Sequence, residues 1–191
     1  GRNSDSESMT TINSGFYISF ESNHRIMFHK SLNSAGSFLP KHKDFKHFKS
    51  NKGLEAIAAN AKGEIFAIPE EPPKEYVDFP VYRLSKGKWS IFSWFPVSGS
   101  FLVTDAVFLP DNDLLILERD YDWGAGFKMQ LRILDFENDT ITGQTELLSL
   151  NSGLHNHEGL SLWQDDAGQI FITSISDNNF LPFVTTEIKE F

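Results

Sequence analysis

Acidic side chains recur at matching points along this 191-residue chain. Three segments place an acid before a small residue and then an aliphatic one, and these acids are Glu55, Asp105 and Glu158. They are separated by 50 and 53 residues. Carboxylates fixed at one position of a repeated unit can bind a hard cation together, or act as acid and base on a substrate.

A second acid follows each of the three segments. After a polar turn, an apolar run ends in an acid, and these acids are Glu70, Glu118 and Asp177. The same pattern locates a degenerate fourth copy at the start of the chain, with Glu7 and Glu21 in the two acidic positions. Glu7 precedes Glu55 by 48 residues, and Glu21 precedes Glu70 by 49. Regular spacing of this kind predicts four copies of one supersecondary unit.

The elements that carry these acids have the character of strands. The apolar runs are short and bounded by polar turns, further hairpins lie between the copies, and helical periodicity is not convincing anywhere. Each unit therefore holds about four strands in roughly 50 residues, the dimensions of a propeller blade. We predict an all-β chain, a β-propeller domain or fragment over residues 1–191, with repeat units at about 5–50, 51–100, 101–153 and 154–191.

The number of blades in the complete ring is a separate expectation. Four units could close a ring, but the chain opens directly on the innermost strand of its first unit, and rings of six or more blades are commoner. We therefore expect part of a six-bladed propeller. An open ring would expose strand edges and apolar blade faces. The remaining N-terminal blades of the same protein, or a second chain, are the expected partners.

Propeller geometry predicts where the acids gather. The first strand of each blade lines the central channel, and the second strand runs antiparallel to it, so both acidic sets should meet at one channel mouth. Two carboxylates about 5 Å apart repel by roughly 3 kcal/mol at an effective dielectric near 20. Protonation, pairing with Arg or Lys, or a bound cation would relieve this repulsion. Oxygen ligands favour Ca²⁺, with Mg²⁺ as an alternative, over Zn²⁺.

The candidate site residues follow from this arrangement. The expected metal ligands are Glu7, Glu55, Glu70, Asp105, Glu158 and Asp177. The expected ligand-binding residues are Glu21, Arg25, Asn178 and Asn179. The expected catalytic residues are Glu118, His24 and Arg119.

Structural roles compete with each of these assignments. Acids at strand starts can cap backbone N–H groups of a neighbouring blade, and a repeat duplicates structural residues as readily as functional ones. His155 and His157 form a His-x-His pair that suits either a metal or ordinary hydrogen bonds. Residues 120–124 form a polar-aromatic loop, which is either a plain connection or part of a rim that contacts a ligand.

Composition excludes several classes of function. The net charge of −9 argues against nonspecific nucleic-acid binding, and the one basic run, residues 41–49, reads as a solvated connection anchored by Phe45 and Phe48 or as a phosphate or RNA patch. The absence of Cys excludes disulfides and thiolate metal sites. No apolar stretch is long enough for a membrane span. The polar start of the chain shows no signal peptide.

Several phrases resemble the bacterial phytase-like family, also called esterase-like activity of phytase. They lie at residues 51–56, 104–110, 114–119, 156–160 and 176–180. The resemblance extends from Asp5 onward and implies the C-terminal part of a β-propeller, because family members normally have further sequence before the Glu7 copy. It also implies an exported protein, periplasmic or secreted. The family name suggests hydrolysis of phosphoesters or esters.

Two functions remain open at this point. In the first, the chain is a metal-dependent hydrolase of phosphate or carboxylic esters, and an unpaired carboxylate or His24 takes a proton from metal-bound water. In the second, it is a non-catalytic propeller that binds a small molecule or a protein partner. Lactone hydrolysis is a third and weaker option, because it rests on analogy alone.

Overall fold

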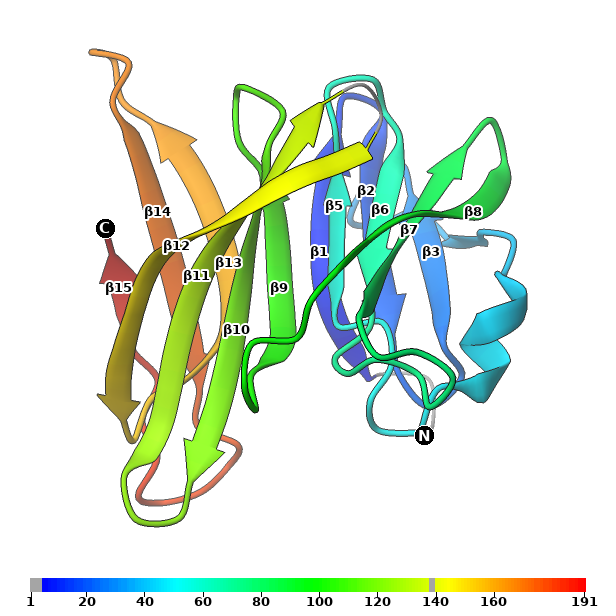
Figure 1. Ribbon diagram of the computed structural model, residues 1–191. Helices are drawn as coiled ribbons and strands as arrows, with labels where there is room; N and C mark the ends of the chain where they lie inside the picture. Colours follow the sequence, from blue (N-terminus) through cyan, green and yellow to red (C-terminus); the bar gives the residue numbers. More distant parts are fainter. Residues whose placement is uncertain (1–4, 138–139) are drawn as a thin grey trace.

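The structure is a computed structural model that describes residues 5–137 and 140–191, and it consists of four antiparallel sheets arranged as propeller blades (Figure 1). The first blade contains β1 (Ser6–Ile12), β2 (Gly15–Phe20), β3 (Arg25–His29) and β4 (Ser37–Phe38). The second contains β5 (Ala56–Ala59), β6 (Ile65–Ile68), β7 (Phe79–Ser85) and β8 (Lys88–Phe95). The third contains β9 (Leu102–Phe108), β10 (Leu114–Asp122), β11 (Gly126–Glu137) and β12 (Thr140–Gly153). The fourth contains β13 (Asn156–Gln164), β14 (Ile170–Asp177) and β15 (Ile188–Glu190).

This arrangement confirms the predicted all-β propeller with four blade-like repeats. In every sheet the strands pair in chain order from the innermost outward, and each sheet lies within one of the expected repeat units. The short 3₁₀ helix η1 (Lys43–His47) lies in the connection between the first two blades. No helix within the described ranges is long and apolar enough to cross a membrane.

The hydrophobic core is divided into three clusters, one between each pair of adjacent blades. Tyr82 and Phe45 anchor the first cluster, which joins the first two blades. Phe66 anchors the second, where three further Phe rings surround it at centroid distances of 5.0–5.7 Å. Leu115 and Leu117 belong to the third, which also includes side chains of the fourth blade. Because adjacent blades share apolar clusters, each blade stabilises the next.

The innermost strands lie around the channel in blade order: β1 packs on β5, β5 on β9, and β9 on β13. Between the first and fourth blades lies an open pocket of about 360 Å³, lined by Met9 of β1 and by Ile175 and Ile188 of the fourth blade. These three side chains are 60%, 44% and 70% exposed. Apolar surface therefore lies open on the facing sides of the first and fourth blades.

Irregular pairing marks the inner strands where the acids lie. In β1 an extra residue is accommodated between Ser6 and Met9, and in β13 between His157 and Gly159. The β9–β10 pairing shifts in the same way beside Asp105. A β-bulge bends its strand locally and changes the direction of its side chains. The acidic signature of the repeat therefore coincides with a repeated bulge in three of the four blades.

Candidate functional site: an acidic channel mouth

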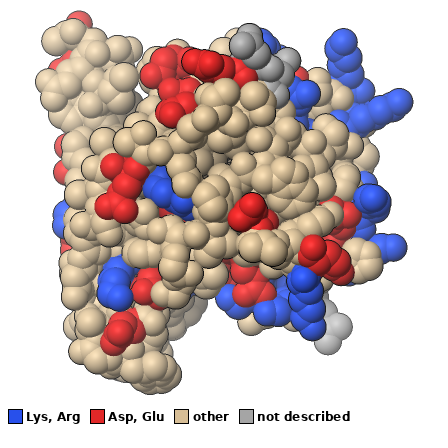
Figure 2. Space-filling view, viewed as in Figure 1, with Lys and Arg blue, Asp and Glu red and all other residues tan. Residues whose placement is uncertain are grey.

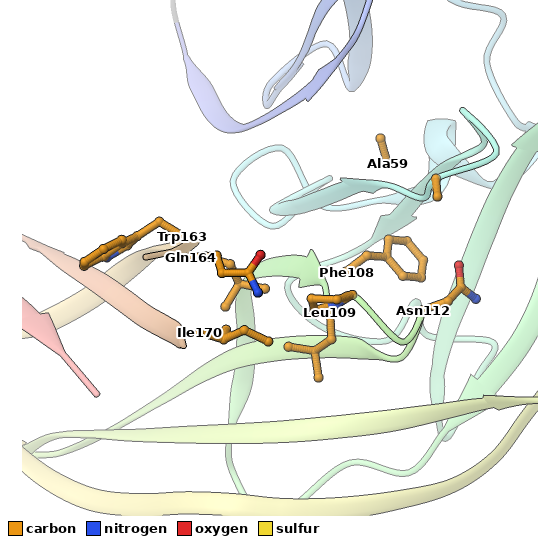
Figure 3. A pocket seen from close by; sticks show the side chains of 10 residues that line it. Ala59, Phe108, Leu109, Asn112, Trp163, Gln164 and Ile170 are labelled. Carbon is orange, nitrogen blue, oxygen red and sulfur yellow. The ribbon is translucent and has the colours of Figure 1, made fainter. Parts of the chain in front are cut away.

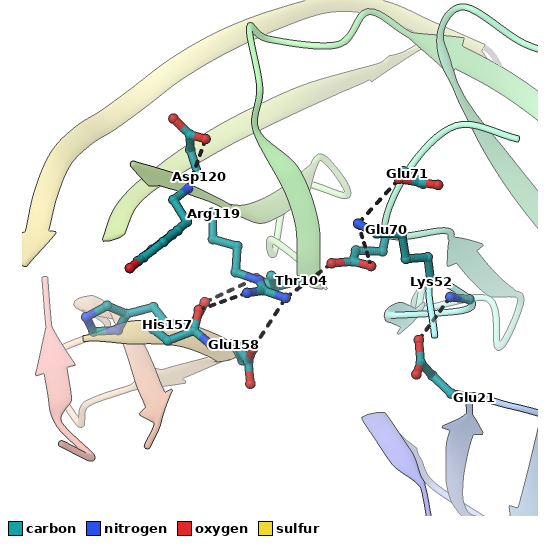
Figure 4. A network of polar contacts seen from close by, with 12 residues as sticks. Glu21, Lys52, Glu70, Glu71, Thr104, Arg119, Asp120, His157 and Glu158 are labelled. Atoms are coloured by element: carbon teal, nitrogen blue, oxygen red, sulfur yellow. Dashed lines mark hydrogen bonds and ion pairs between the residues drawn. The ribbon is translucent and has the colours of Figure 1, made fainter. Parts of the chain in front are cut away.

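Arg119 of β10 connects three blades at the channel mouth (Figure 4). Its Nη2 lies 3.1 Å from Glu70 Oε1 in the second blade and 3.6 Å from Glu158 Oε1 in the fourth. Its Nη1 donates to Asn156 Oδ1 at 3.3 Å, and the Asn156 amide in turn donates to Glu158 Oε1 at 2.6 Å. Arg119 therefore compensates acids of the second and fourth blades on this side of the mouth.

Lysines compensate the acids of the second blade. Lys52 Nζ lies 3.4 Å from Glu70 Oε2 and 3.3 Å from Glu71 Oε2, and Lys49 forms an ion pair with Glu71. Burial still raises the pKa of Glu70, although Lys52 and Arg119 oppose that shift. Glu70 is 4% exposed, so its carboxylate is a buried group with two cationic partners.

The first blade carries a group of acids without such partners. Asp5, Glu7 and Glu21 can each place one carboxylate oxygen so that all three atoms lie within 4.8 Å of one another. Glu55, from the start of the second blade, hydrogen-bonds to Glu7 and Glu21. In the described part of the chain, no ion pair includes any of these four acids. We call these four residues the carboxylate cluster.

The pKa values of the cluster reflect its crowding. Burial, followed by the charge of Glu21, raises the pKa of Glu7 to about 7. Burial, followed by the contact with Glu21, raises the pKa of Glu55 to about 11. In the absence of a cation, Glu55 is therefore protonated at neutral pH and shares its proton with its neighbours. Glu158, across the mouth, also has a pKa raised by burial.

This crowding predicts an unusual dependence of stability on pH. Without divalent cations, we expect the melting temperature to fall as the pH is raised from about 5 to about 9. The folded-state pKa values of Glu7 and Glu55 lie above their ordinary value of 4.5, so the native state binds more protons than the unfolded state. The stability that this provides is complete below about pH 4.5 and is lost as the pH rises through the folded-state values.

Thermal unfolding in EDTA across this pH range would measure the effect. Glu55→Gln imitates the protonated carboxyl group and should remove much of the slope, whereas Asp166→Asn, in an exposed turn of the fourth blade, should leave it unchanged. A melting temperature that rises between pH 5 and pH 9 would show that the carboxylates do not crowd one another.

Asp105 lies deeper in the channel, in a network that joins all four inner strands. Its Oδ1 accepts hydrogen bonds from Ser8 Oγ at 2.7 Å and from Ala106 N at 2.9 Å, and its Oδ2 accepts one from Leu160 N at 2.8 Å. Ser8 Oγ also accepts from Ile57 N at 3.3 Å. Burial raises the pKa of Asp105 to about 7, and the three donors oppose that shift. The structure thus gives Asp105 the backbone-capping role rather than a place at the mouth.

Glu118 also differs from the expectation of a catalytic residue at the mouth. It is fully buried between the second and third blades, where Arg132 of β11 binds both of its oxygens, Nε to Oε2 at 2.6 Å and Nη2 to Oε1 at 2.5 Å. Nη1 of Arg132 also donates hydrogen bonds to Pro96 O at 3.0 Å and to Gln144 Oε1 at 2.8 Å. A carboxylate enclosed in this way has no free face for a substrate, and its role is structural.

His24 is buried beside the mouth rather than open to it. It packs edge-on against the Phe48 ring at a centroid distance of 5.5 Å, and its buried Nδ1 has no hydrogen-bond partner among the described residues. Its Nδ1 lies against Gly53, where an added Cβ would come within 2.1 Å. Burial lowers the pKa of His24. The expected acid or base function therefore has no approach for a substrate at Nδ1.

The remaining expected residues lie at the edge of the site. Arg25 is buried, with its guanidinium group 4.1 Å from the centroid of the Phe20 ring. Asp177 and Asn178 accept hydrogen bonds from Asn179 N and Phe180 N, both at 3.0 Å, and so hold the turn after β14. The charge of Asp177 contributes to the raised pKa of Glu158, after burial, so Asp177 lies near the fourth-blade acid of the mouth.

The histidine pair of the fourth blade is held by hydrogen bonds. His157 Nδ1 lies 3.0 Å from Ser174 Oγ and His157 is buried, while His155 Nδ1 lies 3.2 Å from Thr185 Oγ1. His155 Nε2 lies 2.9 Å from a carboxylate oxygen of Glu187. Both rings thus follow the hydrogen-bonded alternative for the His-x-His sequence.

The opposite end of the channel holds a pocket of a different character, and Figure 3 shows the side chains that line it. This pocket has a volume of about 340 Å³ and is lined largely by apolar side chains such as Phe108, Leu109 and Trp163. None of its lining residues is titratable. The acidic side chains of the channel therefore lie at its other end, away from this pocket.

Sequence reasoning missed several members of the site. Asp5 and Lys52 were not assigned roles in it, and Arg132 was not recognised as the partner of Glu118. Asp5 and Lys52 stand two and three residues before the signature acids Glu7 and Glu55, so extending the repeat backward would have found both. The pairing of Arg132 depends on the β10–β11 register, which the sequence did not reveal.

Fold and site together define a β-propeller whose channel has one acidic mouth and one apolar end. Residues 1–180 match the family model described as "Phytase-like: Esterase-like activity of phytase". The chain belongs to this family, which confirms the resemblance of its sequence motifs. None of the curated proteins matches the chain.

Three enzymes of known structure have folds similar to that of this chain. A xylan β-1,4-xylosidase from Bacillus halodurans C-125 matches at a TM-score of 0.57 and 13% identity, over 98% of this chain and 39% of that one. An endo-arabinase from Bacteroides thetaiotaomicron VPI-5482 matches at 0.55 and 12%, over 95% and 72%. The Hadza microbial sialidase Hz136 matches at 0.51 and 12%, over 100% and 47%. At these identities the likeness concerns the fold alone, and the chain spans about two fifths of the xylosidase.

Proposed function

We propose that this protein is a metal-dependent hydrolase of phosphate or carboxylic esters that acts at the acidic mouth. The observation that carries the proposal is the carboxylate cluster, whose acids crowd together without a cationic side chain in any ion pair. Membership of the phytase-like family supports a hydrolytic function and an exported, periplasmic or secreted, protein.

The cluster fits a calcium ion by its chemistry and its spacing. All of its potential ligand atoms are carboxylate oxygens, which hard cations prefer. The oxygens of Asp5, Glu7 and Glu21 all lie within 4.8 Å of one another, so a single cation could contact all three. Ca²⁺ accepts irregular arrangements of carboxylate oxygens more readily than Mg²⁺, which requires a near-octahedral site. Glu55 would complete the group from the second blade.

The residues of the mouth would have different roles in ester hydrolysis. When bound, the cation neutralises the carboxylates, attracts the substrate anion and lowers the pKa of a water molecule. Arg119, already positioned by Glu70 and Glu158, would bind an anionic or carbonyl oxygen of the ester. A carboxylate of the mouth that is not a ligand would accept the proton of the attacking water.

Calcium binding is the first test of this proposal. At a Ca²⁺ concentration of about 100 times Kd, we expect a gain of about 2.7 kcal/mol in stability at pH 8, and hence a rise of about 5–10 °C in melting temperature over EDTA. Glu7→Gln and Glu21→Gln should abolish most of the rise. The matched control Asp166→Asn removes a charge from an exposed turn and should retain it.

Turnover is measured next, on phosphomonoesters, phosphodiesters and carboxylic esters with Ca²⁺ or Mg²⁺. We expect cation-dependent hydrolysis of at least one class, with Arg119→Gln lowering kcat/KM. No thermal shift and no bound metal by elemental analysis would end the metal proposal. Cation binding without any turnover would favour a non-catalytic propeller that binds a small molecule or protein.

We further infer that additional blades complete the wall between the first and fourth blades. Met9, Ile175 and Ile188 leave apolar surface open there, beside Glu7 and Asp105. Blades from the same protein or from a second chain would cover this surface and close the channel next to the carboxylate cluster.

A further inference from the structure

A second polar pocket lies beside the carboxylate cluster, at the connection that contains η1. Its volume is about 350 Å³, and its lining includes Lys41, Lys43 and Lys46 together with His24, His42 and Ser22. None of its lining residues is acidic. In a chain of net charge −9, this is a local concentration of positive charge. Figure 2 shows Lys and Arg side chains projecting along the right-hand side of the molecule, on which η1 lies in Figure 1.

The three pocket lysines differ from their neighbours in the same segment. Lys49 and Lys52 are neutralised by Glu70 and Glu71, but within the described residues no carboxylate lies within ion-pair distance of Lys41, Lys43 or Lys46. Lys41 is held by its Nζ hydrogen bond to Asn23 Oδ1 at 2.7 Å. Its charge is therefore fixed in place without being cancelled.

Asp44, the one acid of η1, does not line the pocket. Asp44 is 7% exposed, and its Oδ2 accepts hydrogen bonds from Tyr76 at 3.0 Å and Tyr82 at 3.1 Å. It also lies 3.4 Å from His42 Nδ1. These contacts draw Asp44 into the core between the first two blades, so it does not line the pocket. The lysines on the same short helix remain as the charge that a ligand would meet.

Ser22 lies between the pocket and the carboxylate cluster. Ser22 lines the pocket, its Oγ donates to Asp5 Oδ2 at 3.2 Å, and its backbone N–H donates to Ser50 O at 3.0 Å. Ser22 has a positive φ of 58°, an uncommon conformation for a residue other than Gly, Asn or Asp. A group bound among the lysines would therefore lie next to the carboxylate cluster.

From these observations we propose that this pocket is an anion site that binds a phosphate-type oxyanion through Lys41, Lys43 and Lys46. The site goes beyond the proposed function, because it uses no residue of the carboxylate cluster and needs no metal. Three ammonium groups around a concave surface attract a multiply charged tetrahedral anion more strongly than a singly charged carboxylate.

Titration of the protein with inorganic phosphate tests the site directly. The titration is done in EDTA at low salt and followed by calorimetry and by amide NMR shifts of Ser22 and Phe48. We expect saturable binding of phosphate and of sulfate that weakens as NaCl is added. Lys43→Gln/Lys46→Gln should weaken phosphate binding by about tenfold, since each exposed charge contributes modestly. Lys62→Gln/Lys88→Gln, the same charge change outside the pocket, should leave it unchanged.

Three outcomes would overturn the site. The first is equal loss of binding in both double variants, the second is absence of any shift at high phosphate, and the third is tighter binding of acetate than of phosphate. The Ca²⁺-induced thermal shift, measured without phosphate, should be unchanged in Lys43→Gln/Lys46→Gln. Failure of the anion site and failure of the metal proposal are therefore distinguishable.

Discussion

Arg132→Met is expected to lower the free energy of unfolding by about 3–5 kcal/mol, the loss typical of breaking a buried ion pair from one side. Glu118 is fully buried, and Arg132 supplies both hydrogen bonds to its carboxylate. Without Arg132, this charge stays between the second and third blades with no partner. Urea unfolding followed by circular dichroism, at a pH above the raised pKa of Glu118, would measure the loss.

A double variant distinguishes a structural role of Glu118 from a catalytic one. Glu118→Leu/Arg132→Met removes both charges and should be more stable than Arg132→Met alone, because apolar side chains can replace a buried ion pair. The recovery of stability will be incomplete, because Pro96 O and Gln144 Oε1 lose the hydrogen bonds that Arg132 donates to them. We expect this double variant to retain Ca²⁺ binding and any ester hydrolysis. A stable double variant with all turnover lost would restore Glu118 to a catalytic role.

The second large effect is expected for Asp105→Ala, which should lower the free energy of unfolding by about 3 kcal/mol at pH 8. Three donors, Ser8 Oγ, Ala106 N and Leu160 N, would lose their acceptor inside the channel. A buried donor left without a partner costs about 1–3 kcal/mol, and partial relaxation reduces the sum. Ser8→Ala should cost less, because it deprives only Asp105 and Ile57 N of one partner each.

The pH dependence of this variant follows from the raised pKa of Asp105. Its folded-state pKa of about 7 exceeds its ordinary value of 3.8, so its contribution to stability is complete below about pH 4 and is lost as the pH rises through 7. The free energy of unfolding of the wild type should therefore exceed that of Asp105→Ala by more at pH 5 than at pH 8. An equal or smaller difference at pH 5 would contradict the raised pKa. Denaturant unfolding at the two pH values measures it.

The repeat in the sequence was sufficient to predict the fold. Strand-length apolar runs at a regular spacing, separated by polar turns, leave few other ways to bury the Phe-rich surface than stacked four-stranded sheets. The positions of Glu7, Glu21, Glu55 and Glu70 relative to these runs also indicated that acids would gather at one mouth. Antiparallel pairing makes that result a property of local spacing, so the sequence alone could support it.

The roles of the individual acids depended on long-range geometry. Glu118 and Arg119 are consecutive in β10 and so point to opposite faces of the sheet. Glu118 follows Ile116 into the interface with the second blade, whereas Arg119 reaches the mouth. Which face meets Arg132, and which meets Glu70 and Glu158, is decided by register across strands and by packing between blades.

The four acids at the first repeated position therefore have different surroundings in the folded protein. The sequence by itself determined that they recur, that strands carry them and that they converge. Only the tertiary structure decided that Asp105 binds backbone N–H groups, that Glu158 is paired with Arg119, and that Glu7 and Glu55 remain crowded. The physical reason is that compensation of a charge depends on partners from other blades, such as Arg119 and Leu160, whose proximity only the packed ring creates.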